Sequence, residues 1–565
     1  MQTPLTKLAR VSPIILFFLE FVYLAYIHSW EVDPHHDGIM YTAAVGAYEG
    51  KVPNKDFFAQ YGPVTPIIQG FWFRLTEPTL WSLKLLTSLG LAFIGALIYI
   101  GAKRRLSITT SLLLSICWVL TGPFGLPWSS IFSTILVLVS LLLFESVIRS
   151  QFQNKSRVCG FLIGVLLALG VFTRIHVIVV YFAATLALLL LKDARKYHQI
   201  AAVLNVGFFL TFGSIILALV RNQALTAYFD QCILWASGNY AGGPEISLSY
   251  FFNLSWIPIF GVVNLLILKL LANRGNIKRF HVFAIVIPVF VIYTIFVFLS
   301  QNDRSGPETL RNPRILSIIA GQKAQFSFNF LVLSFFVGLA LHKLFLFLKS
   351  KDLRFMAIND SRVVYISIAL GTTTQLYPYT DEYHIAFITP IIIVASIFSL
   401  PQDFRIYEYQ FAFRYFAIAL IPSLVLHSLI LANVERSEFN SKTLMGMYGS
   451  WHSSKSLDLT MLKLETERPG IRFVCADGIY AGAGGRYLSI DEKFVTWGPP
   501  SVQKRVVDRE FICSANQKLI SSYLKQGWRA KFKVLLDPTN DFSNTSYWNI
   551  LFEKSESVPD KEGVH

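Results

Sequence analysis

The residues best suited to chemistry gather in one stretch, Glu31 to Pro63, directly after the first apolar run of the chain. This stretch carries five carboxylates and two adjacent histidines where the chain leaves hydrocarbon for water, namely Glu31, Asp33, Asp37, Glu49, Asp56, His35 and His36. Charge beside hydrocarbon is costly, so its concentration indicates a functional site. An ionised carboxylate at this boundary is suited to act as a general base that removes a proton from a hydroxyl group.

The carboxylates of this stretch differ in what else explains them. Asp33-Pro34 has the form of a helix N-cap followed by proline at the first helical position, and Gly50 is placed to end that helix. Its apolar side predicts a helix that lies at the membrane surface. Asp33 is therefore either a cap or a member of the site. Asp37 falls one turn in, where no cap is needed and the helix dipole keeps it ionised. We expect Asp37 to be the base.

The elements that must position these residues are membrane helices. The chain has 565 residues, of which 53% are hydrophobic and 15% charged, and its mean hydropathy of +0.50 excludes an ordinary soluble protein. We count about thirteen apolar runs of spanning length, at residues 12–30, 80–102, 107–122, 130–148, 158–173, 175–191, 199–220, 251–272, 281–300, 328–347, 362–376, 385–400 and 414–432. The sequence therefore predicts an α-helical polytopic membrane protein.

Basic residues cluster at every second link between the apolar runs, which is the pattern of the positive-inside rule. The net charge of +15 therefore reflects topology and does not indicate a nucleic-acid partner. This pattern predicts a cytosolic N-terminus. It places the chemistry-bearing segments on the opposite, extracytoplasmic face, at residues 31–79, 221–250, 301–327, 377–384 and 433–565. The register depends on splitting 158–191 into two helices at Thr173-Arg174-Ile175-His176, because one helix of that length would exceed the membrane thickness.

Two units are expected, a transmembrane module over 1–432 and a small extracytoplasmic α/β or α+β domain over 433–565. The second unit contains a helix-like segment at Asn516–Gln526 and strand-like runs at Ile471–Ala476, Lys493–Trp497, Glu510–Ala515 and Lys531–Leu536. Its two cysteines, Cys475 and Cys513, could pair if this unit lies outside the cytosol.

A second concentration of chemistry follows in the link Tyr377-Pro378-Tyr379-Thr380-Asp381-Glu382-Tyr383-His384. Asp381 either caps the next helix or belongs to the site together with His384. In the predicted topology this link lies on the same face as Asp37.

The residues of the first loop resemble a known family. The run Asp37-Gly38, Tyr41, Glu49-Gly50-Lys51-Val52-Pro53, Asp56-Phe57 and Tyr61-Gly62-Pro63 is similar to the first extracytoplasmic loop of bacterial GT-C type glycosyltransferases. This superfamily includes protein-mannosyltransferase-like and aminoarabinose-transferase-like enzymes, which take sugars from polyprenyl-phosphate carriers. The close match covers about the first 80 residues. It implies a GT-C fold with Asp37 as the catalytic carboxylate. Gly38 stands where many relatives have a second acid, so Asp33 and Asp56 both remain assisting candidates.

The late link also resembles a motif of these enzymes, in which an acid lies three residues before a histidine at a helix start. Here those residues are Asp381 and His384, although the usual arginine ahead of them is not evident. The loops on the predicted extracytoplasmic face supply the expected substrate-binding residues His36, Tyr41, Lys55, Tyr61, Arg174, Arg311, Arg314, Asp381 and His384. Among them Arg174 is either part of the site or an arginine that snorkels to the membrane interface.

The resemblance implies an inverting transfer of a hexosyl or pentosyl group from polyprenyl phosphate to a glycan, lipid or protein acceptor of the cell envelope. It also implies a multi-pass protein of the bacterial plasma membrane, with the site facing outward or toward the periplasm. The departing phosphate needs cationic help, from arginine, lysine or a metal.

Three alternatives stay open at this stage. A divalent ion such as magnesium or manganese could bind the carboxylates and histidines, but His35 and His36 point to different helix faces, so no metal ligand is assigned. A transporter or flippase of lipid-linked or small solutes would also have many spans, although the apolar runs carry few ionisable groups near their middles. The third alternative is a non-catalytic lipid-binding or scaffold protein.

Overall fold

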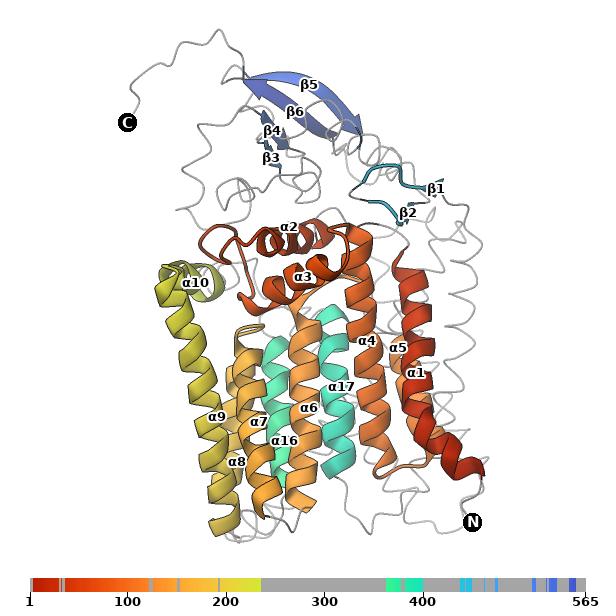
Figure 1. Ribbon diagram of the computed structural model, residues 1–565, viewed down its shortest axis with the longest axis vertical. Coiled ribbons are helices and arrows are strands. Elements are labelled where there is room, and N and C mark those ends of the chain that lie inside the picture. Colours follow the sequence, from red (N-terminus) through yellow and green to blue (C-terminus); the bar gives the residue numbers. More distant parts are fainter. Residues whose placement is uncertain are drawn as a thin grey trace, which may run out of the picture.

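The computed structural model shows a bundle of apolar helices with two short helices across one end (Figure 1). It describes residues 4–29, 32, 36–120, 125–149, 153–191, 194–234, 362–376, 382–399, 437–442, 444–449, 462, 473–475, 511–514, 525, 528–535 and 548–554. The predicted spans 251–272, 281–300, 328–347 and 414–432 lie outside these residues. The domain division at residue 432 is likewise untested and stays a prediction.

Every predicted span that falls in the described residues coincides with an apolar helix. The helices are α1 (Pro4–His28), α4 (Leu80–Lys103), α5 (Ile108–Leu120), α6 (Ser129–Arg149), α7 (Gln153–Val171), α8 (Val177–Leu189), α9 (Ala194–Arg221), α16 (Arg362–Thr373) and α17 (Glu382–Ser399). Of these, α4, α6 and α9 are long and apolar enough to cross a membrane by length and composition. The predicted break at Thr173–His176 is confirmed, because it separates α7 from α8.

Local sequence explains where these helices begin and how closely they pack. The side chain of Thr79 accepts a hydrogen bond from the backbone N–H of Ser82 and so caps α4. Helices α7 and α9 approach so closely that a Cβ atom on Gly164 would lie 2.0 Å from the backbone oxygen of Leu204. Small residues allow such backbone contact between membrane helices, where a hydrophobic driving force is weak.

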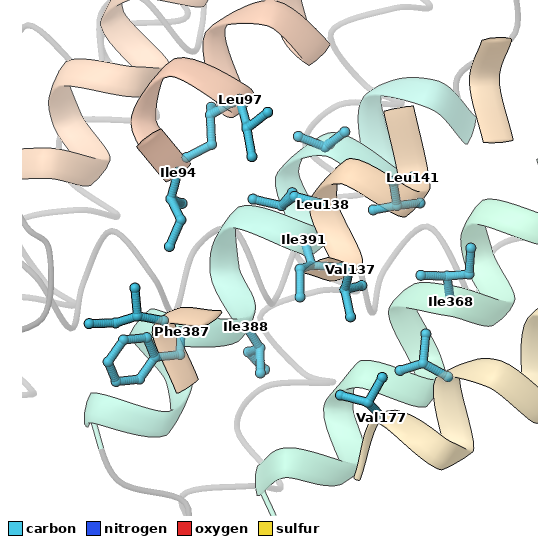
Figure 2. Close-up of a cluster of buried hydrophobic side chains, with 14 of the residues drawn as sticks. Ile94, Leu97, Val137, Leu138, Leu141, Val177, Ile368, Phe387, Ile388 and Ile391 are labelled. Atoms are coloured by element: carbon cyan, nitrogen blue, oxygen red, sulfur yellow. The ribbon is translucent and has the colours of Figure 1, made fainter. Parts of the chain in front are cut away.

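The centre of the bundle is a cluster of buried hydrophobic side chains from five helices (Figure 2). Leu138 of α6 and Ile391 of α17 lie at its middle, Ile94 of α4 lies on one side, and Ile368 of α16 and Val177 of α8 lie on the other. All of them are essentially inaccessible to solvent. Burial of this kind fixes the relative positions of the helix ends, and those ends carry the functional residues.

The first loop forms helices α2 (His36–Tyr48) and α3 (Val64–Leu75), which lie across the end of the bundle (Figure 1). The predicted helix and its end are confirmed, since Gly50 follows α2 with a φ of +82°, a conformation that favours glycine. The apolar side of α2 is directed at the protein, because Met40, Ala43 and Ala44 are buried. Asp33 lies outside the described residues, so its role as a cap stays a prediction.

After α9 the chain forms the short helices α10 (Leu225–Phe229) and η1 (Asp230–Leu234), and η4 (Thr374–Leu376) extends α16. A two-stranded ladder, β1 (Ser437–Glu438) with β2 (Tyr448–Gly449), is joined to α1 because the N–H of Tyr448 donates to the carbonyl of Ser29 at 2.8 Å.

The tail contains a four-stranded sheet in the order β3 (Phe473–Cys475), β4 (Phe511–Ser514), β6 (Trp548–Lys554), β5 (Trp528–Leu535). Among the described strands of this sheet, β3 and β4 pair in parallel and the other neighbours are antiparallel, and the register of β3 and β4 places Cys475 opposite Cys513. The runs predicted near β3, β4 and β5 are confirmed as strands, whereas β6 was not predicted. The predicted strand at Lys493–Trp497 and nearly all of the predicted helix at Asn516–Gln526 lie outside the described residues. The sheet lies at the same end of the bundle as α2 and α3 (Figure 1).

Candidate active site

The centre of the candidate site is a buried ion pair between the first loop and the bundle. The Nζ atom of Lys84 lies 2.7 Å from Oδ2 of Asp37, and the two side chains are 5% and 0% exposed. Asp37 is in the first turn of α2, where the positive end of the helix dipole favours the ionised carboxylate. Because desolvating two charges costs several kcal/mol per ion, a buried pair of this kind is weak evidence for stability and better evidence for a function.

The turn of α4 that carries Lys84 is linked to the end of α1 by hydrogen bonds. The hydroxyl of Ser88 donates to the carbonyl oxygen of Lys84 at 2.9 Å, and His28 Nδ1 lies 2.8 Å from that hydroxyl oxygen. Lys84 was missed in the sequence because it stands in the second turn of a predicted span, where a lysine normally reaches outward to the interface. One sequence feature could have identified Lys84. It is the first lysine or arginine after the acidic loop that lies inside a predicted apolar run.

Arg174 is part of the protein interior and does not snorkel to the interface. It lies in the turn between α7 and α8, is 4% exposed, and its guanidinium carbon is 4.6 Å from the centre of the Tyr61 ring. Its Nε atom donates to the hydroxyl of Ser129 at 3.4 Å. The contact with the Tyr61 ring and the hydrogen bond to Ser129 fix the orientation of the planar guanidinium. Its remaining N–H groups are then suited to bind a phosphate.

A glycine allows Tyr61 to reach Arg174. Gly62 has a φ of +126°, and a Cβ atom on it would lie 2.3 Å from the backbone oxygen of Phe172. The N–H of Val64 donates to this same oxygen at 3.3 Å. The loop can approach the end of α7 this closely only because residue 62 has no side chain.

His384 lies at the same end of the bundle, near the start of α17, and its ring centre is 6.0 Å from that of Trp128. Trp128 directly precedes Ser129, the partner of Arg174. The carbonyl of the neighbouring Pro127 accepts a hydrogen bond from Nε2 of Gln69 on α3 at 2.8 Å. The segment 125–129 therefore connects the first loop, Arg174 and the late link. No sequence pattern marked this segment as functional.

Asp56 and Lys55 occupy a tight turn. Oδ2 of Asp56 accepts from the N–H of Val52 at 2.7 Å, and the N–H of Asp56 donates to the carbonyl of Val52 at 2.9 Å. Both contacts give Asp56 a turn-forming role beside the catalytic one predicted for it. Lys55 is exposed.

The preceding residue, Asn54, has a φ of +67° and fastens this turn to η1. Its Nδ2 donates to Oε1 of Gln231 at 2.9 Å, and Nε2 of Gln231 donates back to the carbonyl of Asn54 at 2.8 Å. Beside this pair, the Sγ of Cys232 donates to the carbonyl of Ala59 at 3.1 Å. Burial raises the pKa of the Cys232 thiol to about 12, so it is a neutral structural group.

The remaining predicted residues divide into two groups. Tyr41 is buried, and its hydroxyl donates to the carbonyl of Pro78 at 2.6 Å, so it supports the loop. His36 opens α2, but its side chain lies outside the described part, and so do Arg311, Arg314 and Asp381. Among the residues that the structure describes, no three His, Cys, Asp or Glu side chains gather as a metal site.

No protein-family model and no curated protein sequence matches this chain. Among solved structures, ArnT from Cupriavidus metallidurans in the apo state is similar at 11% identity with a TM-score of 0.48, over 96% of this chain and 98% of that one. The apo Archaeoglobus fulgidus oligosaccharyltransferase is similar at 11% identity and a TM-score of 0.47, over 91% and 70% of the two chains.

The oligosaccharyltransferase AglB of Archaeoglobus fulgidus, solved with an inhibitory peptide and a dolichol-phosphate, is similar at 10% identity and a TM-score of 0.45, over 96% and 75% of the chains. ArnT and AglB are both GT-C glycosyltransferases, the class that the first-loop residues predicted. With TM-scores below 0.5, these likenesses do not indicate a substrate or a mechanism for this chain.

Proposed function

We propose that this protein is an inverting glycosyltransferase that moves a sugar from a polyprenyl-phosphate carrier to an acceptor hydroxyl. The observation that carries the proposal is the buried Asp37–Lys84 pair, which places a carboxylate and a cation together at the end of an apolar bundle. A reaction on a lipid-linked phosphate needs both groups at that depth, one to accept a proton and one to stabilise phosphate charge.

In the proposed reaction Asp37 accepts the proton of the acceptor hydroxyl while that oxygen attacks the anomeric carbon of the sugar. The bond between the anomeric carbon and the phosphate oxygen breaks with inversion, and polyprenyl phosphate leaves with one more negative charge than the phosphodiester had. The ammonium of Lys84 keeps Asp37 ionised in the resting site. As charge develops on the phosphate, Lys84 is positioned to share its hydrogen bonds with the departing group.

Arg174 is proposed as the second cation for the phosphate, because Tyr61 and Ser129 hold it at the same end of the bundle. His384 borders this region through Trp128 and is proposed to contact the donor or the acceptor. The sugar is a hexosyl or pentosyl group, and the acceptor is a glycan, lipid or protein. A divalent metal is not needed for any step in this scheme.

The charge distribution supports an orientation with the site on the extracytoplasmic face, as in a bacterial plasma membrane. Arg104, Arg105, Arg149 and Arg195 stand at the helix ends away from α2 and α3, where the positive-inside rule places cytosolic residues. Labelling of single cysteines from each side tests this orientation. Modification at Asn544 from the cytosolic side would contradict it.

The direct test is a transfer assay with the purified full chain. Incubated with a polyprenyl-phosphate sugar and candidate acceptors, the protein is expected to release polyprenyl phosphate. The charge control is Arg221→Gln, which removes an exposed arginine at the end of α9 and is expected to leave this release unchanged. Absence of release with every hexosyl and pentosyl donor tried, from a folded protein, would count against the proposal.

One observation favours the transporter as second candidate. Glu20 of α1 lies inside the bundle, only 5% exposed, where its Oε1 accepts from the hydroxyl of Ser115 at 2.7 Å. A carboxylate inside a membrane bundle is what an ion-coupled carrier requires. We predict that Glu20→Gln keeps transferase activity within about twofold, since glutamine preserves the contact with Ser115. Solute uptake by vesicles without a covalent product, abolished by Glu20→Gln, would favour the transporter.

A further inference from the structure

A second charged cluster stands at the opposite end of the bundle. We name it the guanidinium cluster, formed by Arg104, Arg105 and Arg149 around Glu145. Nη2 of Arg105 lies 3.3 Å from Oε1 of Glu145, and Nε of Arg149 lies 2.5 Å from the same oxygen. The carboxylate is buried, and its other oxygen accepts from the hydroxyl of Tyr365 on α16.

Part of this positive charge has a structural use. Nη1 of Arg104 donates to the carbonyl of Leu142 at 3.1 Å, and its guanidinium is 6.0 Å from the Phe398 ring of α17. The cluster lies at the C-terminal ends of α4, α6 and α17 and at the N-terminal end of α16. Each helix end carries about half an elementary charge, negative at a C-terminus and positive at an N-terminus, so these four ends sum to about −1.

Within the described residues, the positive charge of the cluster exceeds the negative charge of the helix ends and Glu145. Helix ends and Glu145 together supply about −2, whereas the three guanidiniums supply +3, and Lys103 adjoins them. Hydrogen-bond donors are also in excess, since the buried Nε–H of Arg105 meets no acceptor in the part of the chain that the structure describes. The side chain of Arg149 is 44% exposed, and Arg104 is exposed as well. Each of them has N–H groups that donate to no acceptor among the residues that the structure describes.

The position of the cluster along the membrane normal indicates which anion it meets. Arg104 follows Lys84 by 20 residues along α4 and its C-cap, which at 1.5 Å per residue is about 30 Å. This distance matches the hydrocarbon thickness, so the cluster lies at the depth of lipid phosphates on the far side. The neighbouring Ile108 is 43% exposed, as expected for a side chain that faces lipid.

We propose that the guanidinium cluster binds the phosphate of an anionic phospholipid in the leaflet opposite the candidate active site, with Arg104 and Arg149 as the donors. Planar guanidiniums present paired N–H groups that match phosphate oxygens. Both donors belong to helices that also shape the active-site end, α4 through Lys84 and α6 through Ser129. A bound lipid would thereby hold together the two helices that carry these residues.

Lipid binding is measured by native mass spectrometry of the purified full chain, titrated with phosphatidylglycerol or with phosphatidylcholine of the same acyl chains. The wild type is expected to bind phosphatidylglycerol more tightly. Each lost arginine removes hydrogen bonds to the lipid phosphate and is expected to weaken that binding about fivefold, so Arg104→Gln/Arg149→Gln weakens it about 25-fold. Arg104→Gln alone leaves every contact of Glu145 intact and keeps the test valid if the double variant misfolds.

The matched control is Arg195→Gln/Lys196→Gln, which removes equal charge at the start of α9, at the same end of the bundle. It is expected to change phosphatidylglycerol binding less than twofold. Equal weakening by both pairs of substitutions would show unspecific attraction and overturn the proposal. Displacement of phosphatidylglycerol by inorganic phosphate at equal concentration would also overturn it, because it would assign the site to a soluble anion.

Discussion

Neutralising the buried pair in two steps separates the chemistry of Asp37 from its contribution to folding. Asp37→Asn leaves the ammonium of Lys84 buried without its counter-ion, and Lys84→Met does the same to the carboxylate. Removing one partner of a buried pair costs about 3–5 kcal/mol, a large part of a typical folding free energy of about 5–15 kcal/mol. At the 2.7 Å separation observed here, Coulomb's law with an effective dielectric of about 20 gives about 6 kcal/mol of attraction before desolvation is subtracted.

The double variant Asp37→Asn/Lys84→Met removes both charges together. Its free energy of unfolding is expected to lie within about 1–2 kcal/mol of the wild-type value. The double-mutant cycle should therefore show a coupling of at least about 3 kcal/mol. The free energy of unfolding is followed by denaturant titration in detergent, and release of polyprenyl phosphate is measured on the same samples. We expect the double variant to be folded and inactive.

Two results would refute this reasoning. Retained transfer by the double variant would remove Asp37 from the role of base. A single Asp37→Asn variant as stable as the wild type would show that the two side chains do not form a desolvated ion pair. In that case the burial of Asp37 would not indicate a function for it.

Three further predictions follow from the contacts around the site. Arg174→Lys keeps the charge but loses the planar fork, so kcat/KM for the polyprenyl-phosphate donor should fall about 10–100-fold, an amount equivalent to the loss of one charge-assisted hydrogen bond. Gly62→Ala should destabilise the fold and abolish transfer because its Cβ atom would lie 2.3 Å from a backbone oxygen, whereas Gly50→Ala meets nothing within 4 Å and should cost about 1–2 kcal/mol for the left-handed backbone alone. Cys475 and Cys513 are register partners, so they should form a disulfide in protein from an oxidising compartment. Both thiols should then be alkylated only after reduction, and alkylation of both without reductant would contradict this prediction.

The sequence predicted the described helices well because a spanning helix is a local property. A run of about 20 apolar residues needs no partner to be specified in a membrane, so α4, α6 and α9 appear where hydropathy places them. The end of α2 at Gly50 and the break at Thr173–His176 were also predictable, since both depend on short-range backbone preferences.

Sheet β3–β4–β6–β5 was predicted only in part. Alternation and β-propensity indicate that a strand exists, but they do not determine its neighbours or its register. The cross-strand position of Cys475 and Cys513 is therefore information that the sequence did not contain.

The sequence alone predicted the helices that the structure describes, and it singled out Asp37 in the first loop as the expected base. The tertiary structure decided what Asp37 contacts, because its partner Lys84 stands 47 residues later on another helix. It also decided that Arg174 is buried on Tyr61. A lysine or arginine near a helix end has the same sequence signature whether it reaches toward water or pairs inside the protein. Only the packing of α2 and α3 across the bundle, which removes water from both cations, distinguishes the two cases.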